Sequence, residues 1–163
     1  MLAVIAAMEL KIDLTDIQIA LNSLPQIEHR LQVKPQANGT IIIDDAYNSN
    51  PIGFVSALEL LEILGKKGRK ILVTPGMVEL GAAHKEAHEK IAAKAAHVCD
   101  VIVVINSKRI PSFVEGLKNS GKTLHEVNTF DEAQKWINKN HMGGDVILVE
   151  NDLPDLYERV PKF

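Results

Sequence analysis

Apolar residues recur along this chain at two spacings. From residue 40 onward, short runs of apolar and β-branched residues alternate with longer segments in which apolar residues recur every three or four positions. The first pattern is typical of buried strands and the second of amphipathic helices. The predicted strands are TIIID, KILVTP, DVIVVI, TLHEV and GDVILVE, and a helical segment lies between each pair. Such alternation predicts an α/β fold with a mostly parallel sheet and helices on both faces.

The predicted helices carry recognisable start and stop signals. Asn50 before Pro51 is typical of an N-cap followed by proline at the first helical position, and Gly65 closes that helix. Thr129 and Glu132 have the spacing of a capping box. Two other helices show apolar stripes, formed by Ala87, Ile91, Ala95 and Val98 and by Ile110, Phe113, Val114 and Leu117. A short terminal helix is predicted after Pro154.

The first part of the chain has a different organisation. Two short helical patterns come first, and the second ends at Pro25. Asn38-Gly39 then separates two strand-like runs, which indicates a hairpin. We therefore place a domain boundary near residues 30–36, between a helical segment at 1–33 and a domain at 34–163. Because the chain opens inside an amphipathic helix without a cap, we expect it to be a fragment whose apolar stripe packs on another domain.

Composition narrows the class of protein. The chain has 163 residues, 46% of them hydrophobic and 24% charged, which is typical of a soluble globular domain. A net charge of −3 gives no basic surface for nucleic acid or an anionic membrane. The apolar N-terminus lacks the basic region of a signal peptide and is too short to span a bilayer. The single cysteine, Cys99, is predicted to be a buried, reduced thiol.

One short segment matches a nucleotide-binding pattern. GLKNSGKT, residues 116–123, fits the P-loop pattern at every required position. A working P-loop follows a strand and opens a helix, so that its amides and the helix N-terminus face the phosphates. Here Gly116 lies inside a predicted helix, Gly121 ends it and Thr123 leads into a strand. The segment therefore presents carbonyl groups, and we expect it not to bind ATP, although an independent P-loop nucleotide binder stays an alternative.

Polar loops follow the predicted strands. In parallel sheets, ligands bind beyond the carboxyl ends of the strands, which here lead into DDAYNSNP, PGMVELG, NSKR and ENDLPD. The side chains of Asp44 and Asp45 should point in different directions, and such an acid either holds a ribose or orders a loop. Such a mixture of acidic and basic side chains suits a zwitterionic ligand, although solvated loops are the alternative. The polar residues expected at this edge are Glu79, Lys108, Arg109, Glu150, Asn151, Asp152 and Asp155.

Two histidines stand four residues apart in the predicted helix AAHKEAHEKIAAKAAHV. His84 and His88 form H-x-E-x-H rather than the H-E-x-x-H of zinc peptidases, and the sequence offers no placed third ligand. A solvated helix face is the simpler interpretation, and we expect no metal site in this chain.

Three segments, EHRLQ, DDAYNSNP and TPGMVELG, occur in an order and spacing that resemble the Mur ligases. The resemblance covers essentially the whole chain and is strongest to members that add D-alanyl-D-alanine. It implies that residues 1–33 are the tail of a central ATPase domain and that 34–163 form a C-terminal Rossmann-like domain. Members of this family are ATP-dependent ligases of peptidoglycan synthesis in the cytoplasm. They convert the carboxylate of a UDP-muramoyl-peptide to an acyl phosphate, which an amine then attacks.

The resemblance also implies roles for individual residues. Arg30 would reach the ATP phosphates from the interdomain hinge, and Asp45 would hold the ribose. Tyr47, Asn48 and Asn50 would shape the nucleotide side of the cleft. The mixed-charge edge would receive the amino acid or dipeptide substrate.

In this family the P-loop, the magnesium ligands and the catalytic lysine lie in the central domain. The resemblance therefore implies that this chain is inactive without the remaining domains. After the last strand, this chain has ENDLPDLY where the D-alanyl-D-alanine enzymes carry a Lys-Gly-Ser type segment. With this departure, the resemblance implies either D-alanyl-D-alanine or another, related amine as the substrate. A non-catalytic Rossmann-like interaction module is a further alternative.

Overall fold

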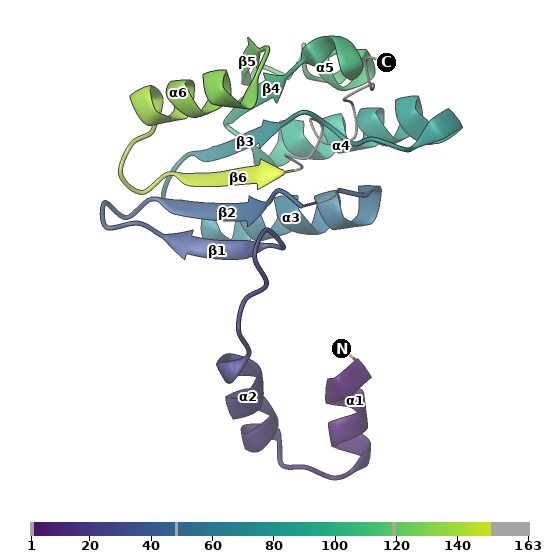
Figure 1. Ribbon diagram of the computed structural model, residues 1–163, viewed down its shortest axis with the longest axis vertical. Coiled ribbons are helices and arrows are strands. Elements are labelled where there is room, and N and C mark those ends of the chain that lie inside the picture. The colour runs from purple at the N-terminus through teal and green to yellow at the C-terminus, as the bar shows by residue number, and fades with distance from the viewer. Residues whose placement is uncertain (1, 48, 119, 151–163) are drawn as a thin grey trace, which may run out of the picture.

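The computed structural model describes residues 2–47, 49–118 and 120–150 (Figure 1). The elements in chain order are α1 (Leu2–Glu9), α2 (Leu14–Ser23), β1 (Gln32–Pro35), β2 (Ile41–Asp45), α3 (Pro51–Leu64), β3 (Lys70–Thr74), η1 (Gly81–Ala83), α4 (His84–Val98), β4 (Val101–Ile105), η2 (Ser107–Arg109), α5 (Pro111–Leu117), β5 (Thr123–Val127), α6 (Phe130–Asn140) and β6 (Val146–Glu150). The predicted strands and the helices between them are confirmed. The helix predicted after Pro154 lies outside the described residues.

The six strands in the described part of the chain form one sheet in the order β1-β2-β6-β3-β4-β5. Strands β2, β6, β3, β4 and β5 run parallel, and β1 pairs antiparallel with β2 through the predicted Asn38-Gly39 hairpin. Gly39 has a φ of +82°, which a residue without a Cβ adopts readily. The parallel strands end at one side of the sheet, called the carboxyl edge below, toward which their arrowheads point in Figure 1.

Helices cover both faces of the sheet, as predicted. Helices α3, α4 and α5 lie on one face, where Phe54, Leu58, Ile91 and Phe113 are fully or almost fully buried in the larger core. Helix α6 lies on the other face, where Ala133 and Trp136 pack against Ile71, Val73 and Val103. Every residue of β4 is buried, as expected for a strand covered on both sides.

Helices α1 and α2 lie apart from the sheet, connected to it by an extended segment (Figure 1). Their apolar side chains are largely exposed: Leu2 is 84% exposed, Leu10 76% and Leu14 67%. Ile17 is the buried residue of α2, and α1 has none. The packing of this apolar stripe on another domain stays a prediction. The boundary between residues 33 and 34 stays a prediction, and β1 already begins at Gln32.

The capping predictions are confirmed with one difference. The side chain of Asn50 accepts the amides of Ile52 and Gly53 at 3.1 and 2.9 Å, and Thr129 accepts the amide of Glu132 at 3.2 Å. The carboxylate of Glu132, however, accepts the amide of Asn128 rather than that of Thr129. The bond reaches one residue further back than in a capping box. Among the described residues, no helix is long and apolar enough to cross a membrane.

Candidate ligand-binding edge

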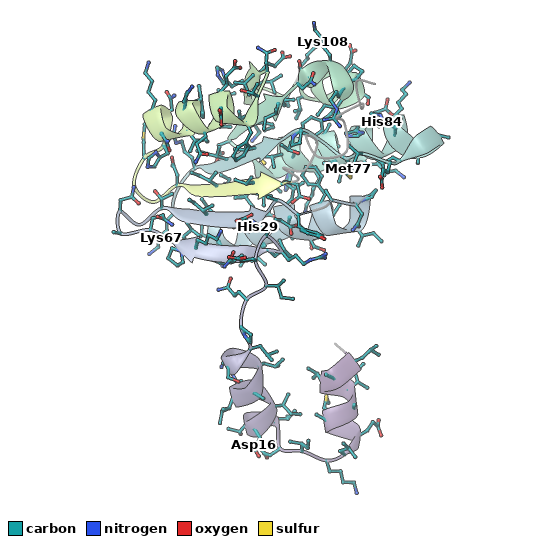
Figure 2. All side chains as sticks on the ribbon, in the orientation of Figure 1. Asp16, His29, Lys67, Met77, His84 and Lys108 are labelled. Carbon is teal, nitrogen blue, oxygen red and sulfur yellow. The ribbon has the colours of Figure 1, made fainter. Side chains whose placement is uncertain are left out.

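The loops that follow β2, β3 and β4 all leave the carboxyl edge because these strands run parallel in one sheet. Figure 2 shows Met77 and His84 on this side of the molecule and Lys67 on the opposite side. The predicted gathering of polar loops is therefore confirmed for these three segments. The segment that follows β6 lies outside the described residues, as do the predicted site residues Asn48, Asn151 and Asp152.

The P-loop-like segment does not belong to this edge. Gly116 lies within α5, which ends at Leu117, and Gly121 has a left-handed φ of +71° before Thr123 opens β5. The order is helix, turn and strand, the reverse of a P-loop. The amides of this segment therefore do not stand at the start of a helix. This agrees with the prediction from the sequence.

Asp44 and Asp45, the last two residues of β2, have different partners. The carboxylate of Asp44 accepts a bond from Lys34 Nζ at 2.5 Å and lies 3.0 Å from His29 Nδ1. Burial opposes the ionisation of Asp44, but the bonds from Lys34 and His29 outweigh it and lower the pKa of its carboxyl group. Asp44 thus acts as a charged anchor that joins β2 to β1 and to the segment before it.

The segment that contains Arg30 is fastened to the tip of β2. Asp45 Oδ1 accepts the backbone amide of Leu31 at 2.9 Å, and the carbonyl of His29 accepts the amide of Tyr47 at 3.1 Å. His29 and Leu31 both have positive φ values, 56° and 49°, which cost free energy in residues with a Cβ. These contacts hold a strained turn in place and set Arg30 at the carboxyl edge.

Arg30 and Tyr47 lie together. The guanidinium carbon of Arg30 is 4.5 Å from the centre of the Tyr47 ring, a cation–π contact, and the Tyr47 side chain is half exposed. The structure therefore brings Arg30, Asp45 and Tyr47 to one place. Asn50 stands just beyond them, but its side-chain oxygen is occupied by the cap of α3.

Glu150 was expected to add negative charge to an exposed edge, and that expectation is wrong. Its side chain is fully buried, and Ser49 Oγ donates to Glu150 Oε1 at 2.5 Å. Burial, together with the neighbouring Asp45, raises the pKa of Glu150 to about 8 in spite of the Ser49 bond. At neutral pH the group is therefore mostly protonated. Asp45 pairs with Glu150 across the parallel strands, which explains their proximity.

The expectation of a solvated helix face is wrong for His88. His88 is fully buried, its Nε2 accepts the amide of Met77 at 3.1 Å, and its ring meets Phe113 edge-on. The sequence held a signal for this burial, since His88 shares helical spacing with the buried Ile91 and Ala95. Among the described residues, no group of three or more His, Cys, Asp or Glu side chains could hold a metal ion.

The remaining predicted residues lie on the loops after β3 and β4. Glu79 is exposed and has a φ of +60°. Lys108 is exposed and Arg109 is half-buried in η2, which follows Asn106 with its φ of +50°. Residues that the sequence did not single out as site residues are Ser49, His29 and His88. Cys99 is fully buried as predicted, and burial raises the pKa of its thiol to about 12.

The arrangement can do two things chemically. Arg30 offers a planar cation to a phosphate or carboxylate, and Tyr47 offers an aromatic ring beside it. The exposed Glu79 and Lys108 offer opposite charges on neighbouring loops. Cys99 is buried, and Ser49 is buried and bonded to Glu150, so neither side chain is presented to a ligand. The exposed charges and the Tyr47 ring make the edge suited to binding a charged ligand.

Comparison with known proteins gives the family. Residues 29–150 match the family model described as "Mur ligase, glutamate ligase domain". The UDP-N-acetylmuramoyl-tripeptide--D-alanyl-D-alanine ligase of Buchnera aphidicola subsp. Baizongia pistaciae is 36% identical over 143 residues, which are 88% of this chain and 30% of that protein. The ligase of the same name from Mycobacterium tuberculosis (strain H37Rv) is 28% identical over 169 residues, 91% of this chain and 33% of that protein.

Solved structures agree. The MurF ligase from Thermotoga maritima in complex with ADP superposes with a TM-score of 0.67 at 29% identity, over 82% of this chain and 30% of that one. MurF from Acinetobacter baumannii superposes with a TM-score of 0.68 at 25% identity, over 92% of this chain and 32% of that one. The chain matches between 30% and 33% of the length of these four relatives. The family match over residues 29–150 establishes that the chain belongs to the Mur ligase family.

Proposed function

We propose that this chain is the C-terminal part of an ATP-dependent ligase that joins D-alanyl-D-alanine, or a related amine, to a UDP-muramoyl-peptide. The observation that carries the proposal is the family match over residues 29–150, which includes Arg30, Asp45, Tyr47 and the loop with Glu79. The relatives at 28–36% identity bear the name of that ligase.

The reaction has two steps. The γ-phosphoryl group of ATP passes to the carboxylate of the muramoyl-peptide, which gives an acyl phosphate and ADP. The amine then attacks the acyl carbon, an amide bond forms, and inorganic phosphate leaves with the proton of the amine going to solvent or a base. Both steps develop negative charge on oxygen atoms, which a positioned cation stabilises.

On this proposal Arg30 and Asp45 act on the nucleotide. Arg30 is held at the carboxyl edge by the turn at residues 29–31, and its guanidinium is directed by Tyr47. Asp45 serves the ribose, and its bond to the Leu31 amide then couples nucleotide binding to that turn. Tyr47, Asn48 and Asn50 complete the nucleotide side. A magnesium ion would neutralise the phosphates, and we assign its ligands to the remaining domains of the ligase.

The other side of the edge serves the amine substrate. Glu79 would face its ammonium group, and Lys108 or Arg109 its carboxylate, since these groups are of opposite charge. Glu150, mostly protonated and buried, would act through Ser49 rather than through its charge. Asn151 and Asp152 stay predicted contacts of this substrate. The cytoplasmic location also stays a prediction.

The first test is an NMR titration of the ¹⁵N-labelled chain with Mg-ADP and, separately, with D-alanyl-D-alanine. We expect Mg-ADP to shift the amides of Leu31, Asp45 and Tyr47, and the dipeptide to shift those of Glu79 and Arg109. L-alanyl-L-alanine is the stereochemical control. Nucleotide-dependent shifts centred on Gly121 and Lys122 would contradict the proposal and favour a P-loop.

The second test measures the reaction in the whole protein with its remaining domains. Phosphate release is expected to require ATP, UDP-muramoyl-tripeptide and the amine together, and this chain alone is expected to release none. If no amine supports amide formation in the whole protein, the ligase proposal is wrong, and an interaction module is the better interpretation.

A further inference from the structure

His88 is buried directly beneath the loop that connects β3 to η1, residues 75–80. Both of its ring nitrogens have partners of known type. The carbonyl of His84 can only accept, so Nδ1, 2.8 Å away, must donate to it. The amide of Met77 can only donate, so Nε2, 3.1 Å away, must accept. The neutral Nδ1-protonated tautomer is the one form of the ring that satisfies both bonds.

The loop fits closely over this ring. Gly76 has a φ of +82°, and a Cβ at this position would lie 2.8 Å from His88 Nε2 and 2.6 Å from Ile110 Cγ2. The amide of Gly76 donates to Thr74 Oγ1 at 2.9 Å, next to the bond from Met77. The backbone of the loop is therefore held at two consecutive amides, and only glycine allows the approach.

The loop is also fixed on both sides of Glu79. The Met77 side chain is buried in the core, and Leu80 packs against the same core. Between them Glu79 is exposed with a φ of +60°. The backbone on either side of Glu79 therefore sets the position of this residue.

We propose that His88 is a positioning residue: its neutral imidazole holds the loop at residues 75–80 in the conformation that presents Glu79 at the carboxyl edge. Protonation would place an N–H against the N–H of Met77, which removes the bond and releases the loop. The assignment of this loop to the amine substrate rests on the proposed function, whereas the link between His88 and the loop does not.

The surroundings of His88 favour the neutral form. Burial is the main cause that lowers the pKa of His88. The bond to the His84 carbonyl raises this pKa, whereas the nearby His84 and Arg109 side chains lower it further. His84 belongs to α4, Arg109 to η2, and the edge-on contact from α5 is the uncharged Phe113. No carboxylate from these elements is among the groups that shift it.

The direct experiment measures the ring and the loop in this chain, without any ligase assay. Long-range ¹H–¹⁵N NMR should show an Nδ1-protonated, Nε2-unprotonated His88 at pH 7. Hydrogen exchange of the Met77 amide, corrected for its intrinsic pH dependence, should accelerate about tenfold or more in His88→Leu, as loss of a buried hydrogen bond implies. In His88→Gln, whose amide oxygen can accept, exchange should stay within about threefold of the wild type.

Two controls separate positioning from general stability. His84→Ala removes the tilted neighbouring ring but keeps the backbone carbonyl, and Met77 exchange should stay near the wild-type rate. Lowering the pH from 7 to 5 should accelerate Met77 exchange in the wild type but not in His88→Gln. An Nε2-protonated ring, or equal Met77 exchange in wild type and His88→Leu, would overturn the inference.

The whole protein then tests the assignment to the substrate. His88→Gln should keep the KM for the amine near the wild-type value, and His88→Leu should raise it while leaving the KM for ATP unchanged. An equal rise of the KM for the amine and the KM for ATP in His88→Leu would overturn the assignment. If the wild-type protein forms no amide with any amine, the proposed function fails while the NMR result on His88 stands.

Discussion

Ser49 Oγ donates a buried hydrogen bond to Glu150 Oε1 at 2.5 Å, across 101 positions of sequence. The bond joins the loop after β2 to the end of β6, the strand at the centre of the candidate site. The second oxygen of Glu150, Oε2, is buried and has no hydrogen-bond partner in the described part of the chain. A neutral carboxyl group is much less costly in such a place than a carboxylate.

Glu150 should therefore make stability depend on pH. Its folded pKa of about 8 lies above the ordinary value of 4.5, so the folded state binds more protons between these values. The stabilising contribution is complete below pH 4.5 and is lost as pH rises through 8. We expect the unfolding free energy of the wild type to fall by a few kcal/mol, to order of magnitude, between pH 5 and 9 relative to Glu150→Gln. Denaturant unfolding across this range measures it, and parallel curves for the two proteins would refute the prediction.

Nucleotide binding should not depend on the P-loop-like segment. Lys122 stands between a helix end and β5 rather than at the start of a helix. We expect Lys122→Ala to leave the affinity of the whole protein for Mg-ATP within about twofold, because a partly exposed charge far from the phosphates is screened and contributes little. Asp45→Ala should weaken it. Calorimetric titration distinguishes the two, and tight binding abolished by Lys122→Ala would reverse the conclusion.

Tyr47 should affect ATP through Arg30. The cation–π contact at 4.5 Å limits the orientations of the guanidinium. Tyr47→Leu should weaken Mg-ATP binding about two- to fivefold, the size expected for an exposed cation–π pair, whereas Tyr47→Phe keeps the ring and should bind nearly as the wild type. The same titration measures both variants. An equal loss of Mg-ATP affinity in Tyr47→Phe and Tyr47→Leu would mean that the hydroxyl group of Tyr47, rather than its ring, supports binding.

The opposite edge of the sheet depends on an ion pair. Arg69 donates to Asp145 through Nε at 3.1 Å and Nη2 at 2.6 Å, and Asp145 is only 2% exposed. Arg69→Met would leave the buried carboxylate without its cation, and we expect a loss of roughly 2–4 kcal/mol in unfolding free energy. Adding Asp145→Asn should recover part of it. If the double variant is no more stable than Arg69→Met, the pair is not the source of the loss.

Local patterns sufficed for much of the fold. The alternation of strand and helix signals predicted a mostly parallel sheet, because each element's spacing reflects which of its faces is buried. The Asn50 cap and the Asn38-Gly39 hairpin depend on neighbouring backbone groups only, so both were predictable. The rejection of the P-loop rested on the same local order of helix and strand.

The candidate site was predicted only in part. Arg30, Asp45 and Tyr47 were named by resemblance, and the structure brings them together. The burial of Glu150 and His88 was not foreseen, since a polar residue at the end of a strand or on a helix is usually solvated. Their partners, Ser49 and Met77, come from other elements, and no local pattern links them.

The sequence by itself therefore determined the order and type of the elements, since hydrophobic spacing and capping act within a few residues. It also determined which loops reach the carboxyl edge, once the strands are parallel. Only the tertiary structure decided the state of the buried groups. Whether Glu150 is neutral and which nitrogen of His88 accepts a bond depend on desolvation and on donors that the fold brings from distant positions.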